Sequence, residues 1–136
     1  MLVLNCQQNY QMEKMMITKK ELLSVCFGGE PSPDDPLIDE ILAAVNIVRK
    51  AYDRPMSPSC FYRTVEWDRA KGRSGNSQHC ILRAVDFRDP TGSLDAWCAR
   101  NVDILAQAGL WLEHPDYTPG WCHLDMKPRK NRVFLP

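Results

Sequence analysis

Three side chains that can bind a metal ion stand out in the sequence. His79 and Asp86 are close together in the chain, and His123 lies far downstream. An extended or turned path between His79 and Asp86 can bring both side chains to one point, where His123 can add a third ligand. Two imidazoles and one carboxylate suit zinc and leave the fourth position open for water, an arrangement that supports hydrolysis. We therefore expect one zinc ion per chain; the simpler alternative is a hydrogen-bonded His–Asp pair and a solvent-facing histidine.

These residues belong to longer motifs in a fixed order. Ser77-x-His79 is followed by six residues and Asp86, and Trp121-x-His123 comes far downstream. With the segments Phe61–Thr64 and Gly109–Glu113, this order resembles the zinc D-alanyl-D-alanine metallopeptidase family, whose fold is shared with the Hedgehog signalling domain. The resemblance covers residues 37–125.

The resemblance implies a peptidase that hydrolyses an amide bond in peptidoglycan peptides, in a phage-type lysis or tail-associated setting. In the family, the arginine that matches Arg63 holds a substrate carboxylate, which its planar fork suits. Ser77 matches a serine that contacts substrate. Trp121 adjoins the site in the sequence and can form a wall of the pocket, with a place in the core as the alternative. An ordinary surface arginine and a loop-capping hydroxyl are the alternatives for Arg63 and Ser77.

The general base is not evident from the motifs. Relatives often carry an acid three residues before the last histidine, or a histidine two before it; here Gly120 and Trp121 stand there. We favour Glu113, because a strand end holds geometry better than a loop. Asp125 can instead accept a hydrogen bond from a ring nitrogen of His123. The family's usual glycine between the first two ligands is Leu82 here. The other candidate bases are His114, Asp116 and Asp125.

Two further functions remain open at this stage. A zinc-stabilised binding module that has lost catalysis is favoured by the missing acid at Gly120, and the Hedgehog domain illustrates this outcome for the fold. A metal-free interaction protein is the third possibility.

Composition limits the partners and the compartment. The 136 residues include 17 basic and 17 acidic side chains, so no overall field favours nucleic acid. No run of apolar residues is long enough to cross a bilayer. Six scattered cysteines without a C-x-x-C pair predict reduced thiols, with a disulfide framework as the alternative. We see no signal peptide and expect a cytoplasmic product that reaches the cell wall by phage-assisted release or as a virion component.

The predicted architecture is α+β, with helices packed on a small, mostly antiparallel sheet. Residues 1–16 are expected to be poorly ordered, and residues 17–136 to form a single domain. Capping signals and apolar spacing predict helices over 18–27, 36–53 and 93–108, and a helical turn over 64–70. Strands are predicted over 59–63, 81–87, 110–112, 121–124 and 132–135.

Overall fold

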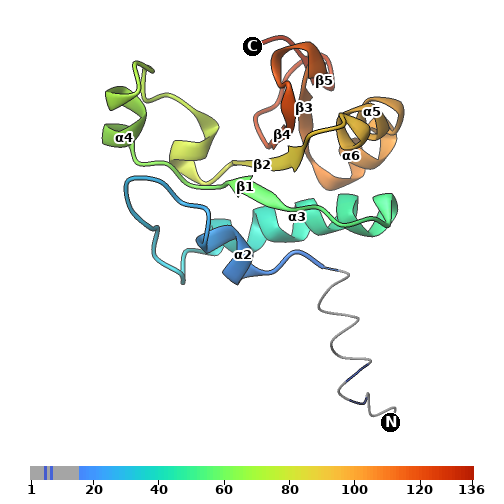
Figure 1. Cartoon of the computed structure of the whole chain (residues 1–136), viewed down its shortest axis with the longest axis horizontal. Helices are drawn as coiled ribbons and strands as arrows, with labels where there is room; N and C mark the ends of the chain where they lie inside the picture. The colour runs from blue at the N-terminus through green and yellow to red at the C-terminus, as the bar shows by residue number, and fades with distance from the viewer. Residues whose placement is uncertain (1–4, 6, 8–15) are drawn as a thin grey trace.

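The computed structural model describes residues 5, 7 and 16–136. The segment 1–16, predicted to be poorly ordered, therefore lies almost wholly outside the described residues. The described part has the predicted α+β architecture, in which helices pack on one mostly antiparallel sheet (Figure 1).

The sheet has five strands in the order β1-β2-β4-β3-β5. All neighbours are antiparallel except β3 and β5, which pair in parallel. The strands are β1 (Pro58–Cys60), β2 (Ala84–Asp89), β3 (Trp111–Glu113), β4 (Gly120–Asp125) and β5 (Val133–Phe134).

The two faces of the sheet differ in character. Val85 lies opposite Leu124 and Phe87 opposite Cys122, and all four side chains are buried in the core. Because side chains alternate along a strand, the residues between them point to the other face. That face carries Asp86 and its register partner His123. The hydrophobic packing of one face thus fixes which side chains the other face presents.

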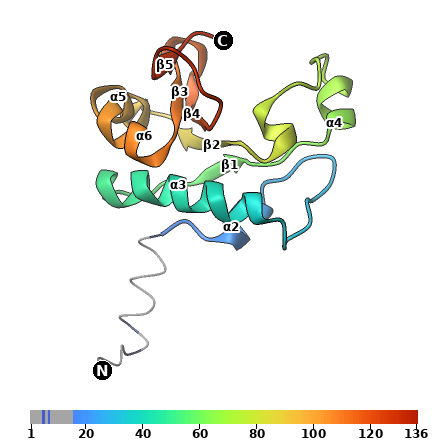
Figure 2. The ribbon, with the colours of Figure 1, turned by 180° about the vertical axis from the view of Figure 1, so that it is seen from behind.

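The helices surround this sheet. Asp35 caps the longest helix, α3, by accepting a hydrogen bond from Leu37 N at 3.0 Å, and Pro36 opens it, as predicted. In Figures 1 and 2, α4 and the α5–α6 pair lie at opposite ends of the sheet, while α3 runs below β1 and packs against α6. The helices are α2 (Lys19–Leu23), α3 (Pro36–Tyr52), α4 (Val65–Ala70), α5 (Ser93–Arg100) and α6 (Val102–Ala108), with 3-10 turns η1 (Gln78–Ile81) and η2 (Pro115–Tyr117).

The single helix predicted over 93–108 was wrong, because the chain breaks at Asn101. Its backbone leaves the helical region at φ −127° and ψ 46°, and its side-chain amide donates to Trp97 O at 2.8 Å. The break turns the second segment, so that Leu105 is buried and Val102 is exposed. The helix predicted to reach residue 27 is also shorter and ends at Leu23.

Two further expectations concern cysteines and membranes. Cys26, Cys60, Cys80, Cys98 and Cys122 are free thiols. Within residues 5, 7 and 16–136, no helix has the length and apolar character needed to cross a membrane.

Gly28 packs against Thr64 and Trp67 at the start of α4, so its substitution should lower the stability of the protein. Its φ is +82°, and a Cβ there would lie 2.2 Å from Thr64 Oγ1 and 2.6 Å from Trp67 Cβ. We expect Gly28→Ala to lower the free energy of unfolding by about 2–4 kcal/mol, from steric overlap added to backbone strain. Gly72→Ala is the matched control, because Gly72 has φ +83° but nothing within 4 Å; its loss should be about 1 kcal/mol. Equal losses in urea denaturation would contradict the steric argument.

Asp95 of α5 should make stability depend on pH. It is buried and accepts a hydrogen bond from Thr118 Oγ1 at 3.0 Å. Burial, with the charges of Asp89 and Glu113, raises its pKa to about 6, against opposing hydrogen bonds from Cys122 and Thr118. The unfolded pKa is about 3.9, so the folded state binds more protons between these values, and this group's contribution to stability falls as the pH rises through them.

Asp95→Asn removes this titration. Relative to the wild type, the variant should therefore gain about 1–2 kcal/mol of unfolding free energy between pH of about 4 and about 7.5. Urea denaturation of both proteins at the two pH values measures the gain, and any pH-independent cost of the amide cancels in the comparison. Parallel stability curves for the two proteins would show that Asp95 titrates normally.

Candidate metal centre

One row of side chains crosses the sheet on the face opposite the core. Cys60 of β1 is the register partner of Asp86 of β2, and Asp86 is the partner of His123 of β4. On the other side of β4, Leu112 pairs with Leu124. Continuing that register by one residue places Glu113 beside His123. Since cross-strand partners share a face, strand pairing brings these side chains together from distant parts of the chain.

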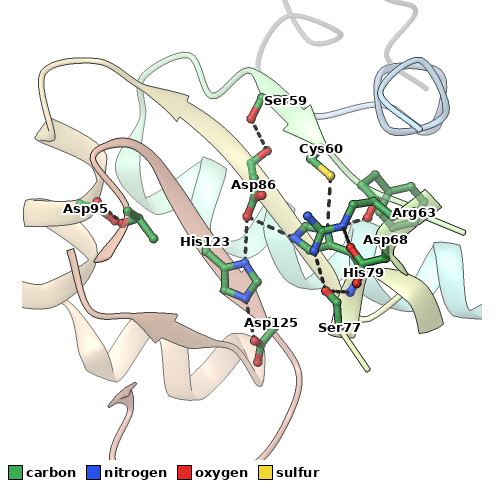
Figure 3. A network of polar contacts seen from close by, with 12 residues as sticks. Ser59, Cys60, Arg63, Asp68, Ser77, His79, Asp86, Asp95, His123 and Asp125 are labelled. Atoms are coloured by element: carbon green, nitrogen blue, oxygen red, sulfur yellow. Dashed lines mark hydrogen bonds and ion pairs between the residues drawn. The ribbon is translucent and has the colours of Figure 1, made fainter. Parts of the chain in front are cut away.

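His79 reaches this row from the turn η1, whose N-cap is Ser77. Its Nδ1 lies 2.7 Å from the carbonyl oxygen of Phe61. A carbonyl only accepts hydrogen bonds, so Nδ1 carries the proton and Nε2 has a free lone pair when the ring is neutral. Nε2 lies 3.3 Å from Asp86 Oδ1 (Figure 3). A backbone partner on the other ring nitrogen is the usual support of a metal-binding histidine.

His123 approaches the same oxygen from the other side. Its Nδ1 lies 2.8 Å from Asp86 Oδ1, and its Nε2 lies 2.7 Å from Asp125 Oδ2 (Figure 3). Burial lowers the pKa of His123, but hydrogen bonds to Asp125 and Asp86 outweigh it and raise the pKa to about 9. Burial acts to raise the pKa of Asp86, yet the two histidines hold that pKa well below its usual range. A metal ion bound at Nδ1 must displace the proton held there.

One nitrogen of each histidine lies close to the same oxygen of Asp86. The distances of 3.3 and 2.8 Å join Asp86 Oδ1 to His79 Nε2 and His123 Nδ1. Two ligand atoms bound tetrahedrally to zinc at about 2.0–2.1 Å are themselves about 3.4 Å apart. Each histidine nitrogen therefore lies near the distance from Asp86 Oδ1 that two ligands of one zinc ion would have.

Cys60 is a possible metal ligand that sequence reasoning missed. With His79 and Asp86 it forms a group whose ligand atoms lie within 4.8 Å of one another. Its Sγ, however, lies 3.8 Å from Nδ1 of His79, the nitrogen that faces the Phe61 carbonyl. Burial and the charge of Asp86 raise the pKa of the thiol to about 12, whereas the thiolate is the ligand form. His123 is not in this group, so Cys60 and His123 are alternative third donors, and only strand pairing reveals Cys60.

Asp125 is fully engaged and orients His123. Its side chain is 1% exposed and accepts hydrogen bonds from Arg129 at 2.6 and 3.2 Å and from Lys127 N at 3.1 Å. The Arg129 guanidinium also lies 3.3 Å from the centre of the Phe134 ring, which in turn is 6.1 Å from the His123 ring. The C-terminal segment therefore packs against the third candidate ligand.

The remaining candidate bases differ in how freely they can accept a proton. Asp116 has an 85% exposed side chain, and its backbone N–H donates to His114 Nδ1 at 3.1 Å, so these two residues partner each other in their loop. Glu113 is half-buried, and its carboxylate accepts no hydrogen bond from the described residues. Burial, with the charges of Asp86 and Asp125, raises its pKa despite the opposing effect of His123.

Arg63 follows β1 and is held at both ends of its guanidinium. Its Nη2 donates to Ser77 Oγ at 2.7 Å, and its Nε lies 3.3 Å from Asp68 Oδ1. Ser77 Oγ also accepts from His79 N at 3.2 Å. Arg63 and Ser77 thus lie next to the turn that carries His79 (Figure 3). Sequence reasoning missed Asp68, which lies on α4 and forms an ion pair with Arg63.

The backbone also shows where Trp121 and Leu82 lie relative to the candidate ligands. Trp121 is two residues before His123 on β4, so it shares the face of the sheet with His123, and it is half-buried. Leu82 adopts φ +65°, a left-handed conformation that favours glycine, as it closes the turn that carries His79. Leucine therefore follows the backbone path that a glycine takes more easily.

A family model described as Peptidase M15 matches residues 8–110. The matched part contains Arg63, Ser77, His79 and Asp86, and His123 lies beyond it. No curated protein and no solved structure matches the chain.

Proposed function

Since this chain belongs to the peptidase M15 family, we propose that it is a zinc-dependent peptidase that hydrolyses an amide bond in peptidoglycan peptides. The observation that carries the proposal is the convergence of His79 Nε2 and His123 Nδ1 on one oxygen of Asp86, at 3.3 and 2.8 Å. The opposite nitrogen of each ring already has an oxygen partner. Both rings are therefore oriented as metal ligands usually are.

His79, Asp86 and His123 would hold the zinc ion. When bound, zinc supplies a Lewis acid for the scissile carbonyl and lowers the pKa of a coordinated water. Asp125 positions the His123 ring, and Arg129 holds Asp125 in place. Asp86 contributes a negative charge that partly balances the cation.

Glu113 is the proposed general base. Its place beside His123 in the sheet and its carboxylate without a hydrogen-bond partner among the described residues support this role. A carboxylate fixed on a strand can accept the proton of the attacking water and then pass it to the leaving amine. Arg63, Ser77 and Trp121 border the same region, where Arg63 favours a substrate with a carboxylate and Trp121 covers one side.

The proposal is tested by metal analysis and by hydrolysis. We expect purified protein to contain one zinc ion per chain and to release amino groups from peptidoglycan, to lose activity on chelation and to regain it with zinc. Zinc without release of amino groups would point to the binding module instead. Protein without metal that also fails to take up added zinc would leave a metal-free interaction protein.

A further inference from the structure

The candidate metal centre has further side chains on both sides of it along the strands. Asp86 and His123 are register partners of β2 and β4. On β4, Trp121 and Asp125 lie two residues before and two residues after His123, and the register partner of Trp121 is Arg88. Because alternate residues of a strand share a face, these side chains lie on the same face of the sheet as the candidate ligands. The metal centre therefore has one side at Asp125 and another at Arg88 and Trp121.

The Asp125 side is covered by the C-terminal segment. Trp111 of β3 is the register partner of Asp125, and its Nε1 donates a hydrogen bond to Arg129 O at 3.1 Å. The guanidinium carbon of Arg132 lies 4.0 Å from the centre of the Trp111 ring. Arg129 Nη1 lies 2.6 Å from Asp125 Oδ1. The aromatic and charged groups on this side therefore already have partners within the chain.

The Arg88 side has no such cover among the described residues. Arg88 is exposed, and its guanidinium has no hydrogen-bond or ion-pair partner there. Trp121 is half-buried, and its ring has no stacking or hydrogen-bond partner within residues 5, 7 and 16–136. At a rise of about 3.4 Å per residue, both residues lie about 7 Å along the strands from the candidate ligands. Free N–H donors and a partly exposed indole thus adjoin the metal centre.

Arg88 and Arg63 lie on opposite sides of the metal centre. β1 and β2 are antiparallel, and Cys60 of β1 is the register partner of Asp86 of β2. Arg63 comes three residues after Cys60, where the chain continues beyond β1. Arg88 comes two residues after Asp86 on β2, so the chain carries the two arginines in opposite directions from this pair. A substrate that lies along the strands with one end near Arg63 would bring its other end over Arg88.

We propose that Arg88 and Trp121 bind a sugar of the glycan strand to which the substrate peptide is attached. One face of a pyranose ring carries C–H groups that can pack against an indole, while its hydroxyl and acetamido oxygens accept hydrogen bonds from a guanidinium. The stem peptides of peptidoglycan are joined to a sugar through their amino ends, so a sugar at Arg88 directs the rest of the peptide toward Arg63. The inference rests on the proposed function and adds that glycan-linked peptide is preferred to free peptide.

The test compares one pentapeptide in two forms, N-acetylated and attached to the disaccharide N-acetylglucosaminyl-N-acetylmuramic acid. The peptide is L-alanyl-γ-D-glutamyl-L-lysyl-D-alanyl-D-alanine in both, so the carboxylates are identical and only the sugars differ. Each form is titrated into the purified protein and followed by NMR, with KM in place of Kd where hydrolysis is fast. We expect the wild type to bind the glycopeptide about 10-fold more tightly, the size of one net hydrogen bond to a charged group. The ratio should fall to about 2 or less in Arg88→Gln and in Trp121→Leu, because each variant removes one of the two contacts.

Arg100→Gln is the matched control. Arg100 is exposed at the end of α5, and its guanidinium has no partner among the described residues. Its replacement removes the same charge from a helix instead of from the sheet face, so the ratio should stay within about twofold of the wild-type value. The proposal is overturned if Arg88→Gln keeps the wild-type ratio, if Arg100→Gln lowers it equally, or if the wild type binds both forms alike.

The proposed peptidase activity is read separately in the same samples. Release of new amino groups from the N-acetylated pentapeptide reports on hydrolysis without any sugar. Cleavage of both forms with equal affinity keeps the peptidase and removes the sugar site. Preference for the glycopeptide that is lost in Arg88→Gln, without release of amino groups from either form, keeps the sugar site and removes the peptidase.

Discussion

Replacing His123 by Ala is expected to abolish stable zinc binding, whereas replacing Cys60 by Ala should leave it nearly unchanged. His123 presents Nδ1 to the Asp86 oxygen that also faces His79. Cys60 instead lies beside the nitrogen of His79 that is bonded to a backbone carbonyl. Removing an outer hydrogen-bond partner of a metal ligand typically costs about 10–100-fold in affinity. Removal of a ligand should cost more than that.

Zinc affinity measured by competition with a chromophoric chelator decides between the two ligand sets. His114→Ala is the control, because it removes a histidine that faces Asp116 in a loop. We expect His123→Ala to lose zinc, and Cys60→Ala and His114→Ala to stay within a few-fold of the wild type. Loss of zinc in Cys60→Ala with retention in His123→Ala would make Cys60 the third ligand. Circular dichroism of each variant excludes unfolding as the cause.

Replacing Glu113 by Gln should reduce kcat by about 10²–10⁴-fold, the range for removal of a general acid–base group. The amide keeps the shape of the side chain but does not accept the proton. Zinc content should remain at one per chain, because Glu113 lies beside His123 without holding any of the three donor atoms. The measurement is the initial rate of amino-group release at saturating peptide.

Asp116→Asn is the control for Glu113→Gln. It removes a carboxylate three residues further along, on an 85% exposed side chain, and should leave kcat within about twofold, as expected of a solvated surface charge. A Glu113→Gln enzyme that retains most of the wild-type kcat would rule out Glu113 as the base. A loss of kcat accompanied by loss of zinc would instead make Glu113 a support of the metal centre.

Helices were predicted correctly where a capping residue or a proline at one position determines the backbone conformation. The helix over 36–53 followed from the Asp35 cap, Pro36 and apolar residues at spacings of three and four, and α3 spans Pro36–Tyr52. The break at Asn101 was not predictable from spacing, because apolar residues continue across it. Its cause is a side-chain hydrogen bond to Trp97 O, which competes with the helix only in this setting.

The candidate ligands were predicted from the sequence, whereas their neighbours across the sheet were not. His79, Asp86 and His123 were identified from motif order, and the structure brings them together. The place of Cys60 beside Asp86 depends on which strands are neighbours, which no local pattern specifies. The Arg63–Asp68 ion pair likewise needs the turn of α4 to bring the two charges together. Long-range register therefore decides which side chains become neighbours in the site.

Asp86 of β2 and His123 of β4 are register partners. Metal binding would therefore report whether these two strands have paired in the correct register. Sliding β4 by one residue along β2 would turn His123 into the hydrophobic layer and send Cys122 outward, since successive residues of a strand alternate sides. Misassembled chains would thus lack a ligand even with every residue intact. Metal uptake during refolding should accordingly follow the docking of β4 rather than the formation of α3.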